Sequence, residues 1–262
     1  MMTTLTEKLI FDSHAHFDDS RFENPLEFLT ELYEKWWVSD IINCAVDLES
    51  AKKCLSFSKA LPFCHTAAGF HPQNLPEGEM APHIDALAKI LREEKIVAVG
   101  EIGLDYYWDI SRKEEQIAYF KEQLRLANEF NLPVSVHDRE AHGDTLQILK
   151  ELKPKGVVHC FSGSVEMAKE ILKLGMFLGV GGVVTFKNSK TVKAVVEETP
   201  IERILLETDA PYLAPEPFRG KTCHSGLIYY TAEKVAEIKN MSTEEVLKIT
   251  NDNARSLLLK EV

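Results

Sequence analysis

Residues 96–130, IVAVGEIGLDYYWDISRKEEQIAYFKEQLRLANEF, indicate the fold class. Ile96–Gly100 is a short apolar run rich in β-branched residues, which predicts a buried strand. Glu114–Phe130 repeats apolar residues at steps of three and four, which is typical of a helix with one buried face. A buried strand followed by such a helix is the repeating unit of a parallel sheet covered by helices.

The same strand–helix unit recurs along the chain. The predicted strands are Leu9–Asp12, Asp40–Ala45, Phe63–Ala68, Ile96–Gly100, Pro133–Val136, Gly156–Val158, Met176–Val180 and Ile204–Glu207. Eight units in 262 residues match the size of a closed α/β barrel, roughly 250 residues folded as one domain. We therefore predict a TIM-type (β/α)8 barrel in which residues 1–262 form a single domain.

Composition restricts the class of protein and of partner. Apolar residues make up 45% of the chain and charged residues 27%, as in globular proteins. The net charge of −11 repels polyanions, so any contact with nucleic acid must be local. Five cysteines without a C-x-x-C pair fit a reduced, cytoplasmic compartment. Met1–Lys8 is polar and no apolar run is long enough for a membrane span, so we expect no membrane contact.

Residues that can bind metals follow several of the predicted strands. His14 and His16 follow the first run and, two positions apart in extended chain, point to the same side. The others are Glu101, His137, His159 and Asp209, after the fourth, fifth, sixth and eighth runs. Because the carboxyl ends of barrel strands share one rim, we expect all six to lie together.

Four imidazoles and two carboxylates suit two divalent cations if one carboxylate bridges them. We predict that Glu101 is the bridge, since Gly100 and Gly103 leave room beside it. Asp209 is the predicted general base, because a carboxylate next to a metal can accept a proton from water. Two ions about 4 Å apart activate water for hydrolysis, and Mg²⁺, Mn²⁺ or Zn²⁺ would suit these ligands.

Further residues are expected on the same rim. His71 follows the third run, and we expect it to contact the substrate or the leaving group. Arg139 can bind a carboxylate or phosphate, or instead form a salt bridge with Asp144. The aromatic residues at positions 106–108 either stack an unpaired base or pack as a lid.

Six ordered motifs resemble the TatD family of metal-dependent hydrolases. They are FDSHAH at 11–16, GFHP at 69–72, GEIGLDY at 100–106, VHDREA at 136–141, HCFSG at 159–163 and LETDAPYL at 206–213. The resemblance implies an amidohydrolase-like barrel that acts as a divalent-metal deoxyribonuclease, commonly a 3′ to 5′ exonuclease. It also implies metal ligation by the same six residues.

The resemblance is less specific for substrate. The family often continues Arg-Gly-Lys with Arg-Asn-Glu-Pro, whereas residues 219–225 read RGKTCHS here, which puts substrate contacts of this loop in doubt. We expect DNA as the substrate, single-stranded or at 3′ ends, because an acidic protein neutralises few phosphates. The alternatives are ester or amide hydrolysis, for instance of D-aminoacyl-tRNA, and a barrel that binds metal without catalysis.

Overall fold

The computed structural model describes residues 7–259. Residues 1–6, within the polar segment Met1–Lys8, and residues 260–262 lie outside the described residues. The described chain alternates strands and helices in the predicted order. None of its helices is long and apolar enough to cross a membrane.

Eight parallel strands form the inner wall of the described chain and are hydrogen-bonded in sequence order. They are β1 (Ile10–Ala15), β2 (Val38–Cys44), β3 (Cys64–Ala68), β4 (Ala98–Asp105), β5 (Val134–Arg139), β6 (Gly156–Val158), β7 (Phe177–Val180) and β8 (Ile204–Leu206). A parallel bridge between Ala15 and Ala210 joins the chain after β8 to β1. The predicted (β/α)8 barrel is thereby confirmed.

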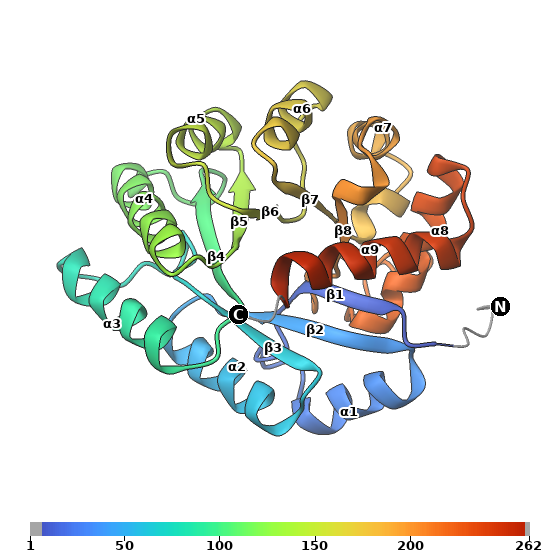
Figure 1. The fold of residues 1–262 in the computed structure, drawn as a ribbon, viewed down its shortest axis with the longest axis horizontal. Coiled ribbons are helices and arrows are strands. Elements are labelled where there is room, and N and C mark those ends of the chain that lie inside the picture. Colours follow the sequence, from blue (N-terminus) through green and yellow to red (C-terminus); the bar gives the residue numbers. More distant parts are fainter. Residues whose placement is uncertain (1–6, 260–262) are drawn as a thin grey trace.

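Helices surround the strands (Figure 1). They are α1 (Pro25–Lys35), α2 (Leu48–Ala60), α3 (Met80–Glu93), α4 (Lys113–Glu129), α5 (His142–Leu152), α6 (Val165–Lys173), α7 (Lys190–Glu198), α8 (Ile228–Lys239) and α9 (Thr243–Leu258). Short 3₁₀ turns are η1 (Gly182–Thr185), η2 (Ile201–Arg203) and η3 (Ser225–Leu227). The helix predicted at Glu114–Phe130 corresponds to α4, whose Phe120, Leu124 and Ala127 are buried while Arg125 is exposed.

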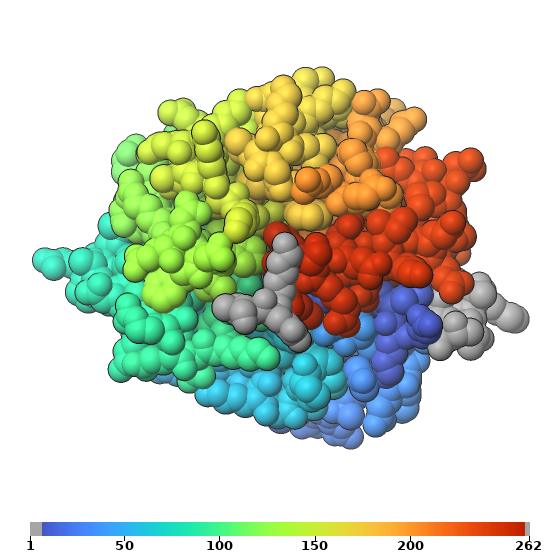
Figure 2. All heavy atoms as spheres, viewed as in Figure 1, coloured from blue at the N-terminus to red at the C-terminus, as the bar shows by residue number. Residues whose placement is uncertain are grey.

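The helix α9 covers the amino-terminal end of the barrel. Its Asn251 donates to the carbonyl of Leu9 at 3.1 Å, and its Asn253 donates to the carbonyl of Ile204 at 2.9 Å. These carbonyls lie at the beginnings of β1 and β8. In Figure 1 α9 crosses the face turned to the viewer, and in Figure 2 its red side chains fill part of that face. The opposite, carboxyl-terminal end is therefore the one available for a site.

Two buried glutamines of α4 hold loops at that carboxyl-terminal end. Gln123 accepts from the backbone N–H of Phe70 at 2.7 Å and donates to its carbonyl at 3.1 Å. Gln116 accepts from the N–H of Asp105 at 3.0 Å and donates to the carbonyl of the same residue at 3.1 Å. The apolar face of α4 thus packs on the barrel while its amides fix the chain after β3 and β4.

The fourth strand differs most from its prediction. It extends to Asp105 rather than ending at Gly100, because Gly103, Leu104 and Asp105 continue to pair with β5. Glu101 therefore lies within the strand, not after its last residue. Glycine is required at position 103, where φ is +148° and a Cβ would lie 1.9 Å from the carbonyl oxygen of His137. This close approach brings β4 and β5 together at the site.

Candidate metal centre at the carboxyl end of the barrel

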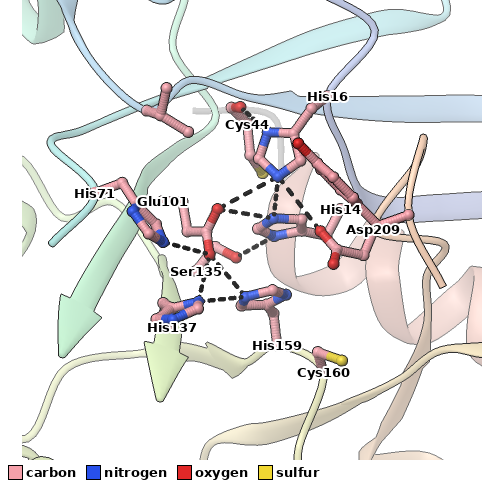
Figure 3. A network of polar contacts seen from close by, with 12 residues as sticks. His14, His16, Cys44, His71, Glu101, Ser135, His137, His159, Cys160 and Asp209 are labelled. Carbon is pink, nitrogen blue, oxygen red and sulfur yellow. Dashed lines mark hydrogen bonds and ion pairs between the residues drawn. The ribbon is translucent and has the colours of Figure 1, made fainter. Parts of the chain in front are cut away.

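The six predicted ligand residues converge at the carboxyl-terminal end of the barrel (Figure 3). They are His14 in β1, Glu101 in β4, His137 in β5, and His16, His159 and Asp209 in the loops after β1, β6 and β8. Three overlapping groups each place candidate ligand atoms within 4.8 Å of one another. The groups are His14/Glu101/His159, His14/His16/Asp209 and His71/Glu101/His137.

Glu101 lies at the centre of the cluster, with its two oxygens facing different imidazoles. Its Oε2 lies 3.3 Å from Nε2 of both His14 and His16. Its Oε1 lies 2.8 Å from Nδ1 of His137 and 2.8 Å from Nε2 of His159. A carboxylate that presents one oxygen to each of two groups of nitrogens has the arrangement of a bridging ligand.

Neighbouring groups orient the imidazoles of His14 and His16. Nδ1 of His14 lies 2.9 Å from the Ser135 hydroxyl, and Nδ1 of His16 lies 2.7 Å from the carbonyl of Cys44. The Nε2 atoms of His14 and His16 thereby face the centre and lie 3.1 Å apart. Partners that fix the outer nitrogen are the common support of histidine metal ligands. Two buried nitrogens facing each other in this way fit a shared cation.

Asp105 and Glu207 support the other two imidazoles. Oδ2 of Asp105 lies 3.1 Å from Nε2 of His137, and a carboxylate oxygen of Glu207 lies 3.6 Å from Nδ1 of His159. No role was predicted from the sequence for Asp105, Glu207 or Ser135. The sequence contained a signal for two of them. Asp105 stands an even number of positions from Glu101 in β4, and Ser135 stands an even number from His137 in β5, so each shares a side of its strand with a ligand.

Charge is balanced within the cluster. Burial alone would raise the pKa of the Glu101 carboxyl, but the imidazoles of His159, His71 and His14 hold it well below its usual range. Burial opposes protonation of His16, yet hydrogen bonds to Asp209 and Glu101 hold its pKa well above the usual value. A bound cation would replace the protons that are shared between the carboxylates and the imidazoles, and would supply the same positive charge.

His71 lies closer to the centre than its predicted role in substrate contact requires. Its Nε2 is 3.6 Å from Oε1 of Glu101, and its ring packs against that of His137 with the centroids 4.5 Å apart. Burial lowers the pKa of His71 to about 3, so the ring is neutral at neutral pH. A neutral imidazole can accept a hydrogen bond or bind a metal, so His71 is suited to either role.

Arg139 ends β5 at the rim of the cavity. Its guanidinium lies over the rings of Tyr107 and Trp108, 4.0 Å and 5.3 Å from their centroids. The alternative salt bridge with Asp144 is wrong, because Asp144 pairs instead with Lys113 at 2.8 Å and with the Tyr106 hydroxyl at 2.8 Å. Arg139 thus remains directed at the cavity, which has a volume of about 720 Å³ and contains the metal-binding cluster.

Comparison with known proteins agrees with this geometry. The chain matches a family model described as "TatD related DNase" over residues 11–259. It is 39% identical over 255 residues to the "uncharacterized metal-dependent hydrolase YabD" of Bacillus subtilis, covering 95% of this chain and 98% of that protein. The crystal structure of YjjV, a TatD homologue from Escherichia coli, superposes with a TM-score of 0.90 at 29% identity, covering 97% of this chain and 99% of that chain.

Proposed function

The chain belongs to the TatD family of metal-dependent hydrolases, and we propose that it hydrolyses phosphodiester bonds of DNA as a 3′ to 5′ exonuclease. The observation that carries this proposal is the position of Glu101, which presents one oxygen to His14 and His16 and the other to His137 and His159. Two divalent cations, Mg²⁺, Mn²⁺ or Zn²⁺, would be held by these five residues and Asp209.

The donor set fits such ions. It combines imidazole nitrogens with carboxylate oxygens, which bind all three metals, and at least two residues of each candidate group line the cavity. When bound, the ions would polarise a phosphoryl oxygen and make water a better nucleophile at neutral pH. The chain would then hold the phosphate, accept a proton and exclude bulk water.

Asp209 is the residue we propose as general base. Burial alone would raise the pKa of its carboxyl, but the hydrogen bond from His16 and the nearby His159 lower it, so the carboxylate is ionised at neutral pH. Its Oδ1 lies 3.4 Å from Nε2 of His16, and the side chain lines the cavity. An ionised carboxylate at this edge can accept a proton from the attacking water.

Arg139 and His71 would bind the substrate from the other side of the cavity. The fork of N–H groups of Arg139 suits the non-bridging oxygens of a phosphate. His71, neutral because burial lowers its pKa to about 3, can contact the leaving oxygen or bind one of the ions. These assignments separate proton acceptance at Asp209 from phosphate binding at Arg139.

The test uses single-stranded DNA labelled at either end. Metal-stripped protein is supplied with Mg²⁺, Mn²⁺ or Zn²⁺, and the products are resolved by length. We expect a labelled mononucleotide first from the 3′-labelled strand and a descending ladder from the 5′-labelled strand. Asp209→Asn should abolish both while the fold, followed by circular dichroism, is retained. Absence of nucleotide release with every metal, with amino-acid release from D-aminoacyl-tRNA, would instead favour the deacylase.

A further inference from the structure

Large exposed apolar side chains gather at the end of the barrel that holds the metal centre. Among the described residues they are Leu26, Tyr107, Trp108, Ile110, Tyr212 and Leu213. Each lies between the carboxyl end of a strand and the first turn of the next helix. Trp108 is the most exposed at 67% and also lines the cavity of the metal centre. An aromatic ring kept in water beside a site is suited to contact a ligand.

The loop that carries Trp108 is fixed to the metal centre rather than free. Oδ1 of Asp105 accepts from the N–H of Tyr107 at 2.9 Å and from that of Trp108 at 3.4 Å. The other oxygen of Asp105 lies 3.1 Å from Nε2 of His137. Gln116 also donates to the carbonyl of Asp109 at 3.2 Å. One carboxylate therefore sets both an imidazole of the centre and the aromatic pair at the rim.

The side chain of Trp108 is not enclosed by its neighbours, since it is 67% exposed. Tyr107 meets it edge-on, with an interplanar angle of 87° and centroids 4.9 Å apart, so Tyr107 does not cover the indole by stacking on it. The guanidinium of Arg139 lies over both rings, 4.0 Å from the centroid of Tyr107 and 5.3 Å from that of Trp108. Within residues 7–259 no carboxylate lies within 4.0 Å of its guanidinium, and it is the one Lys or Arg that lines the cavity. Among the described residues, the rim thus combines a largely exposed aromatic ring with a guanidinium that has no ion-pair partner.

We propose that Trp108, Tyr107 and Arg139 form a binding site for one unpaired nucleotide next to the bond that is cleaved. The nucleobase stacks on the exposed ring of Trp108, and its phosphate binds Arg139. This inference rests on the proposed phosphodiesterase function and specifies its substrate class. A paired base is already stacked on both sides within a duplex, so the site selects single-stranded or frayed ends.

Binding tests the site without cleavage. The full-length protein with Mg²⁺ is titrated with an octamer of dT and with an octamer of abasic deoxyribose, both carrying phosphorothioate linkages that resist hydrolysis. We expect the wild-type protein to bind dT about tenfold more tightly than the abasic strand. Tryptophan fluorescence should be quenched by dT alone, since stacking on the indole requires a base.

Three variants separate stacking from structure. Trp108→Ala should lower the affinity for dT about tenfold and leave that for the abasic strand unchanged. Trp108→Phe should keep most of the dT affinity but lose the quenching, because Trp36 and Trp37 lie away from the cavity. Ile110→Ala is the matched control, as Ile110 is 61% exposed on the same loop but does not line the cavity. It should bind dT within twofold of wild type.

Two outcomes would overturn the inference. One is equal binding of dT and abasic strands by the wild-type protein. The other is self-association that Trp108→Ala abolishes, measured by sedimentation, because the aromatic rim would then contact a second copy of the chain. Cleavage of unmodified single-stranded DNA is measured separately. A protein that stacks dT but releases no nucleotide would contradict the proposed function and leave the nucleotide site standing.

Discussion

The two ends of the barrel both contain buried polar side chains, but they use them differently. At the amino-terminal end, Asn251 donates to the Leu9 carbonyl at 3.1 Å and to the Ser39 hydroxyl at 2.8 Å, and it accepts from Arg255 at 2.8 Å. The buried Asp40 lies 2.9 Å from Nε2 of His65 and also pairs with Arg255. The charges of Asp40 and Arg255 there are thus paired with each other.

At the carboxyl-terminal end, polar groups of the same kind face one another instead. The Nε2 atoms of His14 and His16 lie 3.1 Å apart, and the rings of His14 and His159 stack with centroids 3.8 Å apart. Two imidazole nitrogens this close need a proton or a cation between them, and two protonated imidazoles would repel each other. The amino end is therefore complete in the folded chain, whereas the carboxyl end is arranged to hold cations in place of its protons.

The largest effect is expected from a substitution at the centre of the metal site, at the carboxyl-terminal end of the barrel. Glu101→Gln keeps the volume of the side chain but removes the charge between the two groups of imidazoles. We expect the kcat for single-stranded DNA to fall at least about 100-fold, because a neutral amide cannot bridge two cations. Steady-state nucleotide release measures this, with circular dichroism as the control for folding. Unchanged turnover would remove Glu101 from the mechanism.

Metal removal and return should produce the next largest effect. Adding Mn²⁺ to metal-stripped protein at about 100 times its Kd should stabilise the fold by about 2.7 kcal/mol. Glu101→Gln should lose this gain. Carboxylates hold the pKa of His16 and of His159 well above the usual value, so metal must displace their protons. The gain should therefore shrink as the pH falls, and thermal unfolding at several pH values checks it.

Asn251→Ala tests the amino end by the same measurements. The substitution leaves the Leu9 carbonyl and the Ser39 hydroxyl without their donor, and the residue is buried with 6% exposure. We expect the free energy of unfolding to fall by about 2 kcal/mol, measured with urea. The kcat and the gain from Mn²⁺ should stay unchanged. A fall in kcat without a change in metal affinity would mean that the two ends are coupled.

The sequence was informative about the centre because the six ligands follow five apolar runs, with His14 and His16 sharing the first. Barrel topology alone then brings His14 and Asp209, nearly 200 positions apart, to one rim. The end of β4 was not predictable, since Gly103 and Asp105 resemble loop residues until their pairing with His137 and Arg139 is known. The strand Ile96–Gly100 was therefore predicted too short, and Glu101 was placed at its end.

The supporting residues were harder to identify for a different reason. Ser135, Asp105 and Glu207 are single polar residues within or next to apolar runs, and each contacts a residue at least 32 positions away. Their roles depend on distances across the barrel, which strand periodicity does not provide. The direction of Arg139 was likewise open, because the pairing of Asp144 with Lys113 is a tertiary contact.

The smallest expected effect concerns His224, a buried imidazole on the carboxyl-terminal side that lies outside the metal centre. It lies after β8 on the carboxyl side, as Asp209 does, but it packs against Phe28 and Trp36, with ring centroids 5.7 Å and 4.9 Å away. Its buried Nδ1 has no hydrogen-bond partner within the described residues. No carboxylate forms an ion pair with His224 within the described residues, so burial outweighs the charge of Glu31 in setting its pKa.

Burial lowers the pKa of His224 from its ordinary 6.5 to about 4. Between pH 6.5 and pH 4 the unfolded chain therefore binds a proton at His224 that the folded chain does not bind. The free energy of unfolding is not reduced by this proton above pH 6.5, and it decreases as the pH falls towards 4. We expect wild type to lose about 1 kcal/mol more than His224→Gln between pH 7 and pH 5.5, measured by urea unfolding. Parallel curves would show that burial does not depress the pKa of this imidazole.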